Sequence, residues 1–169
     1  MRIQSKRGLD SLTFYLLVLT TLLAVASCSE KSSEKSDSAQ IDTYLDQVKY
    51  VLQEVRSMEK EIALAVPADS VTAEVIAPLI GQRFRPKLAD LSKQTEALKP
   101  SHPDLQPSYQ LLKDYLRLRI EGFDLIIEGA RLQDQTLFDQ FSERLAEAEE
   151  VGQSLEMAID RVQQSMGQP

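Results

Sequence analysis

Side chains able to do chemistry are few in this sequence of 169 residues. It contains one cysteine, Cys28, and one histidine, His102. A disulfide framework, a multi-cysteine zinc or iron–sulfur site and the multi-histidine metal sites of helical proteins all need more of these residues. We therefore expect neither a metal ion nor a cofactor, and no network of disulfides.

Acid–base and nucleophilic residues also lack a catalytic pattern. His102 lies in the turn Ser101-His-Pro-Asp104, which favours a role in the turn over a role as a ligand. Paired carboxylates such as Glu121 and Asp124 have the spacing of solvated helix faces. A Ser–His pair that uses His102 stays an open alternative, but no G-x-S-x-G motif supports it. We predict no catalytic residue and interpret the protein as a non-enzyme.

Three cations within five residues, Arg83, Arg85 and Lys87, stand out in an acidic chain. One interpretation is ordinary surface charge around a core residue, Phe84. The other is a small patch that binds an anion or an acidic partner. The formal net charge of −7 argues against nucleic acid as that partner, because phosphate binding needs a basic surface.

The interior of one predicted helix holds an arginine and two glycines. Arg119 lies between two apolar stripes, where it could extend its charged end to water or pair with a carboxylate of a neighbouring helix. Gly122 and Gly129 are seven residues apart and share a face. Each disfavours the helix by roughly 1 kcal/mol relative to Ala, so we expect close approach of another helix there. We expect Ala to destabilise the chain at Gly122, which lies on an apolar stripe, more than at Gly129, where the helix end can relax.

The first 27 residues have the pattern of an export signal. A basic start with Arg2, Lys6 and Arg7 precedes an apolar run over residues 12–26. That run is shorter than the roughly 20 residues that cross a bilayer. A basic segment, a short apolar segment and small residues are typical of a secretory signal peptide.

The end of this signal, Val25-Ala26-Ser27-Cys28, resembles the lipobox of bacterial lipoproteins. The resemblance implies cleavage before Cys28, acylation of Cys28 and attachment to the lipid bilayer through it. Ser29 resembles the residue of lipoproteins sorted to the outer membrane, on its periplasmic side in an organism with two membranes. An uncleaved anchor helix, or an ordinary signal with a coincidental cysteine, are the alternatives.

The elements after Cys28 are a tether and one helical domain. Residues 28–40 are rich in Ser and charge and predict a flexible tether with a reach of about 20 Å. Residues 41–169 show apolar residues three and four apart, with turns at prolines, and no strand pattern. We predict an all-α antiparallel up-down bundle of about four helices, with the second helix kinked or broken near Pro78 and Pro86.

Two of the predicted helices are long and regular. The third, from Asp104 to about Arg131, is apolar around most of its circumference, which predicts a central position. The fourth begins near Thr136, where Thr136-x-x-Asp139 resembles a capping box. Its apolar stripe predicts a buried face: Phe138, Phe141, Leu145, Ala148, Gly152, Leu155, Ile159, Val162 and Met166.

The whole layout resembles small bacterial lipoproteins that combine a lipobox signal, a Ser-rich tether and a helical bundle. It implies a non-catalytic protein of the cell envelope that holds a binding or scaffolding module near the membrane, with an envelope protein as partner. The kinked second helix and the glycines leave an alternative, a carrier of an apolar ligand within the bundle.

Overall fold

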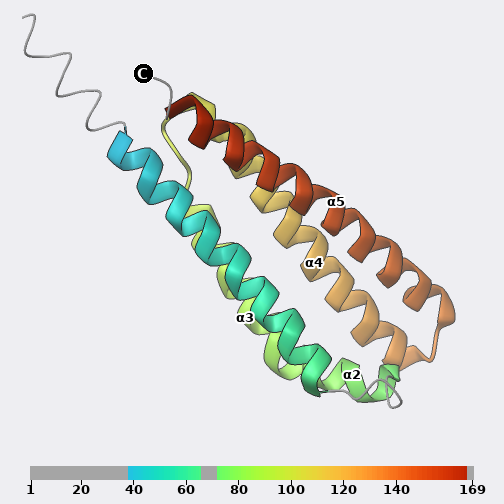
Figure 1. Cartoon of the computed structure of the whole chain (residues 1–169). Helices are drawn as coiled ribbons and strands as arrows, with labels where there is room; N and C mark the ends of the chain where they lie inside the picture. Colours follow the sequence, from blue (N-terminus) through green and yellow to red (C-terminus); the bar gives the residue numbers. More distant parts are fainter. Residues whose placement is uncertain (1–37, 66–71, 167–169) are drawn as a thin grey trace, which may run out of the picture. The chain divides into compact units, whose positions relative to one another are not determined.

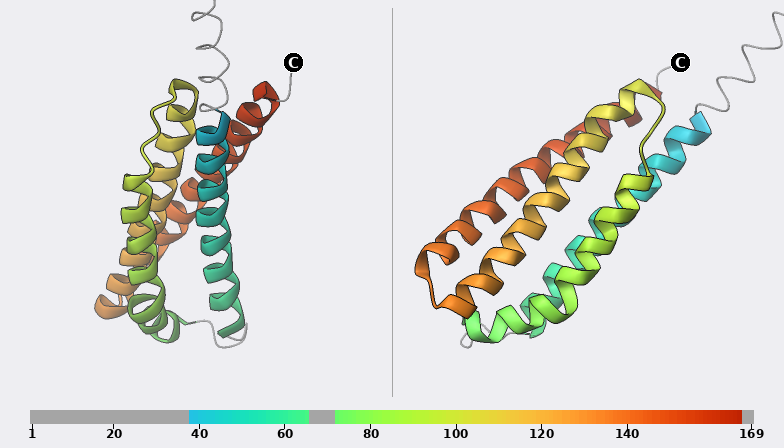
Figure 2. Two further views of the ribbon diagram at one scale, coloured as in Figure 1. Left: turned by 90° about the vertical axis from the view of Figure 1, so that its left-hand side faces the viewer. Right: turned by 180° about the vertical axis from the view of Figure 1, so that it is seen from behind.

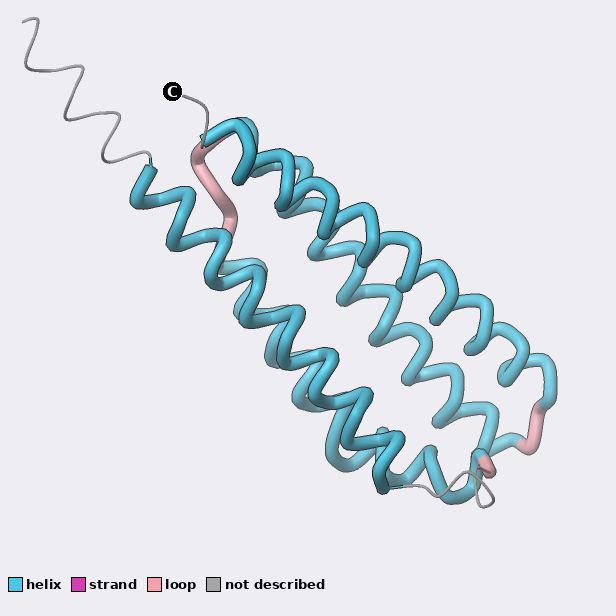
Figure 3. Tube along the Cα trace, viewed as in Figure 1, coloured by secondary structure: helices cyan, strands magenta, loops and turns pink. Residues whose placement is uncertain are grey.

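The computed structural model of the chain describes residues 38–65 and 72–166. The predicted signal peptide, Cys28 and the tether as far as residue 37 lie outside the described residues. Every regular element among the described residues is helical (Figure 3). The predicted all-α antiparallel up-down bundle is confirmed, and it lies in the compact unit Ile41–Pro169 (Figure 1).

Four helical runs make up the bundle. The first is the helix over residues 38–65. The second combines α2 (Ala73–Leu79), the π-helical segment η2 (Ile80–Phe84) and α3 (Arg85–Ala97). The third and fourth are α4 (Gln106–Leu132) and α5 (Gln135–Met166). Successive runs alternate in direction, as both views of Figure 2 show.

The helix over residues 38–65 includes the last three residues of the stretch expected to be tether. Residues 38–40 are Ser, Ala and Gln, and both Ala and Gln are good helix formers. An existing helix also gains residues more easily than a new one nucleates. The three residues therefore continue the helix although they contribute no large apolar side chain.

The second run is irregular where its prolines predict it, but its backbone is not interrupted. Pro78 lies inside α2, and Pro86 lies in the first turn of α3. Between them the helix widens, and the Arg85 N–H donates to the carbonyl of Ile80, five residues back. Pro86 has no N–H for the usual bond to residue 82, so the wider turn is the local solution. Figure 1 shows α2 crossing the end of the bundle before α3 turns along it.

Two short connections flank α4. A 3₁₀ turn, η3 (Pro103–Leu105), precedes it, and His102 caps that turn by accepting the Asp104 N–H at its Nδ1 (3.3 Å). After α4, Gln133 adopts a left-handed conformation (φ 55°) and ends the helix. The Asp134 carboxylate then accepts the Thr136 N–H (2.9 Å). Asp134 is thus the cap of α5, and the expected capping box starting at Thr136 is wrong by two residues.

The core lies between all four runs, with α4 in the centre. α4 contacts α5, α3, α2 and η2, and its Ser108 is hydrogen-bonded to Tyr44 of the first helix (3.1 Å). The central position predicted from its two apolar stripes is confirmed. Fully buried side chains from every run meet there: Val48, Val51, Met58, Ile80, Phe84, Leu88, Leu112, Leu116 and Leu155.

α4 and α5 are in extensive contact along their lengths, and this contact depends on glycines. A Cβ built on Gly129 would lie 2.7 Å from the Phe138 ring and 3.2 Å from Leu137 Cβ. A Cβ on Gly122 would lie 3.3 Å from a Leu145 methyl. The predicted close approach is confirmed at both sites, but Gly129 is tighter than Gly122, which reverses the expected order.

Candidate functional site

The three cations singled out in the sequence lie at the junction between the π-helical segment η2 and α3. Arg83 lies in η2, while Arg85 and Lys87 begin α3. Their charges diverge toward two neighbouring helices. Arg83 and Lys87 pair with Glu61 (2.5 Å) and Glu54 (2.8 Å) of the first helix.

Arg85 makes the opposite connection, to α4. Its Nε and Nη2 donate to the two carboxylate oxygens of Asp124, at 2.9 and 3.1 Å. This two-point contact raises the pKa of Arg85 above its ordinary value. The structure therefore does not bring Arg83, Arg85 and Lys87 together around one point.

The carboxylate partners define what this patch can do chemically. Each cation is already neutralised by a side chain of the same chain, so an anion at the predicted patch would have to compete with Glu54, Glu61 and Asp124. The side chain of Arg83 is largely exposed and that of Lys87 is half-buried, and surface pairs of this kind contribute roughly 0–1 kcal/mol each. Their clearest effect is to connect the irregular η2–α3 junction to the helices on both sides.

Arg119 occupies the most buried charged position among the described residues. Its side chain is 10% exposed, and it pairs with Glu59 of the first helix (2.6 Å) and Glu149 of α5 (3.4 Å). Its guanidinium also lies over the Tyr115 ring, 5.2 Å from the centroid. Of the two interpretations drawn from the sequence, the buried ion pair is the one observed. Arg119 Nε is left without a hydrogen-bond partner.

The single histidine has a structural role in the fold. His102 Nδ1 accepts the Asp104 N–H within the turn before α4, as the turn interpretation predicted. No group of three His, Cys, Asp or Glu side chains within the described residues has the geometry to hold a metal ion. Among the same residues, no helix is long and apolar enough to cross a bilayer.

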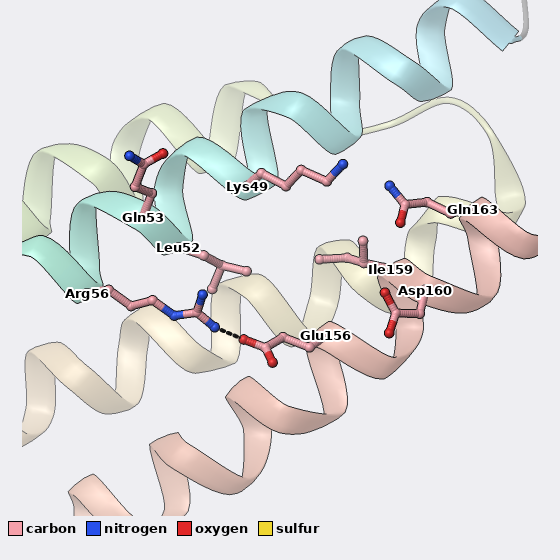
Figure 4. Close-up of a pocket in the computed structure, with 8 residues that line it drawn as sticks. All are labelled: Lys49, Leu52, Gln53, Arg56, Glu156, Ile159, Asp160 and Gln163. Carbon is pink, nitrogen blue, oxygen red and sulfur yellow. Dashed lines mark hydrogen bonds and ion pairs between the residues drawn. The ribbon is translucent and has the colours of Figure 1, made fainter.

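A surface groove of about 440 Å³ lies between the first helix and α5 (Figure 4). One wall carries Lys49, Gln53 and Arg56, and the other carries Glu156, Asp160 and Gln163. The floor is formed by two buried apolar residues, Leu52 and Ile159. Arg56 and Glu156 form an ion pair across one end of the groove. Lys49 and Asp160 carry opposite charges at the other end, and neither forms an ion pair with a described residue.

Sequence reasoning did not identify this groove. Its charged residues occupy ordinary solvated positions on two amphipathic helices, and the two helices are far apart in the chain. The antiparallel order predicts that the start of the first helix lies beside the end of α5. That order alone does not specify which charges face one another.

Comparison of the chain with protein-family models, with curated proteins and with solved structures finds no match.

Proposed function

We propose that this protein is a lipid-anchored lipoprotein of the bacterial cell envelope. The observation that carries the proposal is the position of the chain's one cysteine. Cys28 follows Val25-Ala26-Ser27 directly after a basic start and a short apolar run. Several acyl chains on one residue bind a bilayer far more firmly than the single chain that gives marginal attachment. In an organism with two membranes, Ser29 favours the periplasmic side of the outer membrane.

The helical bundle would then be a non-catalytic binding or scaffolding module held near the membrane surface. Its only histidine is engaged in a turn, and the buried Arg119 is paired with Glu59 and Glu149. These contacts support a structural use of its polar groups. An envelope protein is the partner that this location favours.

The alternative, a carrier of an apolar ligand inside the bundle, is the weaker proposal. It depended on the irregular second run and on the glycines of α4 leaving space between helices. The space beside Gly122 and Gly129 is filled by Leu145 and Phe138 of α5. A lipid that copurifies with the chain and survives native mass spectrometry would favour the carrier instead.

The anchor is tested by metabolic labelling with an alkyne fatty acid. We expect the wild-type chain to be labelled and shortened, and Cys28→Ser to be unlabelled and uncleaved. Ser27→Ala is the matched control, because it keeps a small residue before the cysteine and should be processed normally. Cleavage of Cys28→Ser at the same bond, with continued membrane flotation, would contradict the lipoprotein proposal.

The partner is tested by crosslinking in intact cells that produce the anchored chain. We expect one envelope protein to be recovered repeatedly with the wild-type chain and to be lost with Cys28→Ser. Recovery of the monomer alone, in repeated experiments at several crosslinker lengths, would count against a scaffolding role.

A further inference from the structure

The groove between the first helix and α5 carries opposite charges on its two walls near one end, Lys49 on the first helix and Asp160 on α5, and neither forms an ion pair with a described residue. Figure 4 shows the Lys49 ammonium directed toward the far wall, where Asp160 and Gln163 lie. Toward the other end of the same groove, Arg56 and Glu156 do form an ion pair across it. The two walls therefore repeat one charge arrangement, cation on the first helix and anion on α5, and only one of the two pairs is closed.

The dimensions of the groove restrict what could fill the open end. On the first helix its lining runs from Lys49 to Arg56, which is two turns and about 10 Å. Its volume of about 440 Å³ lies in the range of small-molecule sites. A partner helix would need a longer groove, whereas here the Arg56–Glu156 pair crosses one end. A small ligand fits this length better than a helix does.

The side chains at the open end specify the charge of that ligand. An anionic group beside Lys49 and a cationic group beside Asp160 would each gain a charge-assisted hydrogen bond. Gln53 and Gln163 add an amide on each wall, and Leu52 and Ile159 provide an apolar floor for a short carbon skeleton. A ligand with one charge only would satisfy one wall and leave the other unpaired.

We propose that this groove binds a small zwitterion, with an ammonium group and an anionic group on one short skeleton. Two kinds of molecule have this chemistry: the phosphoethanolamine headgroup of a lipid and a free amino acid. The proposal goes beyond the envelope-lipoprotein function and does not depend on it, because a binding measurement with soluble probes is independent of acylation.

The experiment is an NMR titration of the ¹⁵N-labelled full chain in a non-ionic, sugar-headed detergent, which introduces no other zwitterion. Glycerophosphoethanolamine is the lipid-headgroup probe and alanine is the amino-acid probe. Glycerol 3-phosphate and ethanolamine present the anionic and the cationic group separately. We expect one or both zwitterions to saturate and to shift the amides of residues 49–56 and 156–163. The zwitterion that binds identifies the source.

Two variants and two controls make the titration specific. Lys49→Gln and Asp160→Asn should each weaken binding of the zwitterion about tenfold, since each removes one charge-assisted hydrogen bond. Lys60→Gln on the first helix and Glu143→Gln on α5 change exposed charges outside the groove and should leave binding unchanged. All four positions are exposed, so the unfolding midpoints of the variants should match the wild type and confirm that each is folded.

Three results would overturn the proposal. The first is the absence of saturable shifts in the groove with either zwitterion at millimolar concentration. The second is equally tight binding of glycerol 3-phosphate, which would mean a simple anion site at Lys49. The third is an equal loss of binding in Lys60→Gln, which would mean that overall charge, and not the groove, determines the affinity.

Discussion

Removal of Arg119 and removal of its two carboxylate partners should affect the stability of the fold to different extents. Its guanidinium is almost fully buried, whereas the side chains of its partners Glu59 and Glu149 are 41% and 65% exposed. Removing the arginine would leave two carboxylates that water can solvate. Removing the carboxylates would leave a buried cation with no counter-charge, which is the costly arrangement. The unpaired Nε adds to the cost of keeping the guanidinium in place.

This asymmetry leads to a prediction for substitutions in the cluster. Arg119→Met, which keeps the length of the side chain, should change the free energy of unfolding by less than about 1 kcal/mol or stabilise the chain. The double change Glu59→Gln and Glu149→Gln should destabilise it by about 3 kcal/mol. Urea unfolding followed by circular dichroism measures both. A larger loss for Arg119→Met than for the double change would contradict this account of the cluster.

Gly129 and Gly122 give a second prediction at the level of single residues. Alanine at Gly129 must displace the Phe138 ring, a rigid group on a packed face, and should cost about 1–3 kcal/mol. Alanine at Gly122 meets a Leu145 methyl at 3.3 Å, which can rotate away, so the gain in helix propensity of roughly 1 kcal/mol should nearly offset it. Thermal melts of the two variants test the order.

A matched control for these glycines is available in the second run. A Cβ on Gly81 would meet Ile127 at 3.5 Å, an ordinary contact, so Gly81→Ala should not destabilise the chain by overpacking. Equal or greater loss at Gly122 than at Gly129 would instead support the order expected from the sequence.

The apolar stripe of α5 determines how the last helix packs into the bundle. Leu155 is fully buried and Ala148, Ile159 and Val162 are also buried along the same face. Phe138 and Phe141, in the first part of α5, are only partly buried, and there they pack beside Gly129 and Gly122 of α4. The stripe predicted from spacing is therefore buried from Ala148 to Val162, apart from the half-buried Gly152, and only partly covered before Ala148. The side chain of its last member, Met166, lies outside the described residues.

Leu155→Ala should lower the free energy of unfolding by about 2–5 kcal/mol, since it removes buried methyl groups and leaves a cavity in the core. Met157→Ala is the control, because Met157 is 53% exposed on the same helix. A loss below about 1 kcal/mol for Leu155→Ala in denaturant unfolding would mean that this face is not in the core.

The regular parts of the elements could be predicted because spacing alone encodes them. Local patterns of this kind include the stripes of α4 and α5, the irregular backbone at the prolines of the second run and the turn at His102. The structure shows each of them at the residues where the sequence predicts it. The π-helical form of η2 could not be predicted, because Pro78 and Pro86 require an irregular backbone without specifying its type. The cap at Asp134 was missed because Thr136 and Asp139 offered a competing local pattern.

The candidate sites were less predictable because their partners come from distant segments. The sequence singles out Arg83, Arg85 and Lys87, but their interpretation depends on Glu61, Asp124 and Glu54, which the fold brings beside them. Glu59 and Glu149 likewise become partners of Arg119 only through packing of three helices. The position of Cys28 is a local motif, and its acylation stays a prediction.

Two buried phenols, Tyr44 and Tyr115, make the stability of the folded chain depend on alkaline pH. Burial raises the pKa of Tyr44 and of Tyr115 above the ordinary value of about 10, although the hydrogen bond between Tyr44 and Ser108 opposes the shift for Tyr44 and Arg119 opposes it for Tyr115. The folded chain thus holds these protons more tightly than the unfolded chain. Their contribution to stability is fully present below about pH 10 and is lost as the pH rises through the folded pKa values.

We therefore expect the urea midpoint to be steady from neutral pH to about pH 9 and to fall above pH 10. Tyr115→Phe cannot ionise and should reduce this fall, whereas Tyr50→Phe, at a position 53% exposed, should not. Unfolding curves at several alkaline pH values, for the wild type and both variants, measure the effect. An identical alkaline fall in Tyr115→Phe would exclude this phenol as a cause.

The central position of α4 also has a consequence for the time course of folding. A chain is synthesised from its N-terminus, so the first helix and α2–α3 emerge before the helix that completes their core. Until Gln106–Leu132 is available, their apolar faces have no central partner, and amphipathic helices owe most of their stability to such packing. The α4–α5 pair, by contrast, is joined by two residues, and such local contacts form quickly. We expect the nascent chain to stay largely unfolded until its last third is made. The first two runs should then fold rapidly onto the newly formed α4–α5 hairpin.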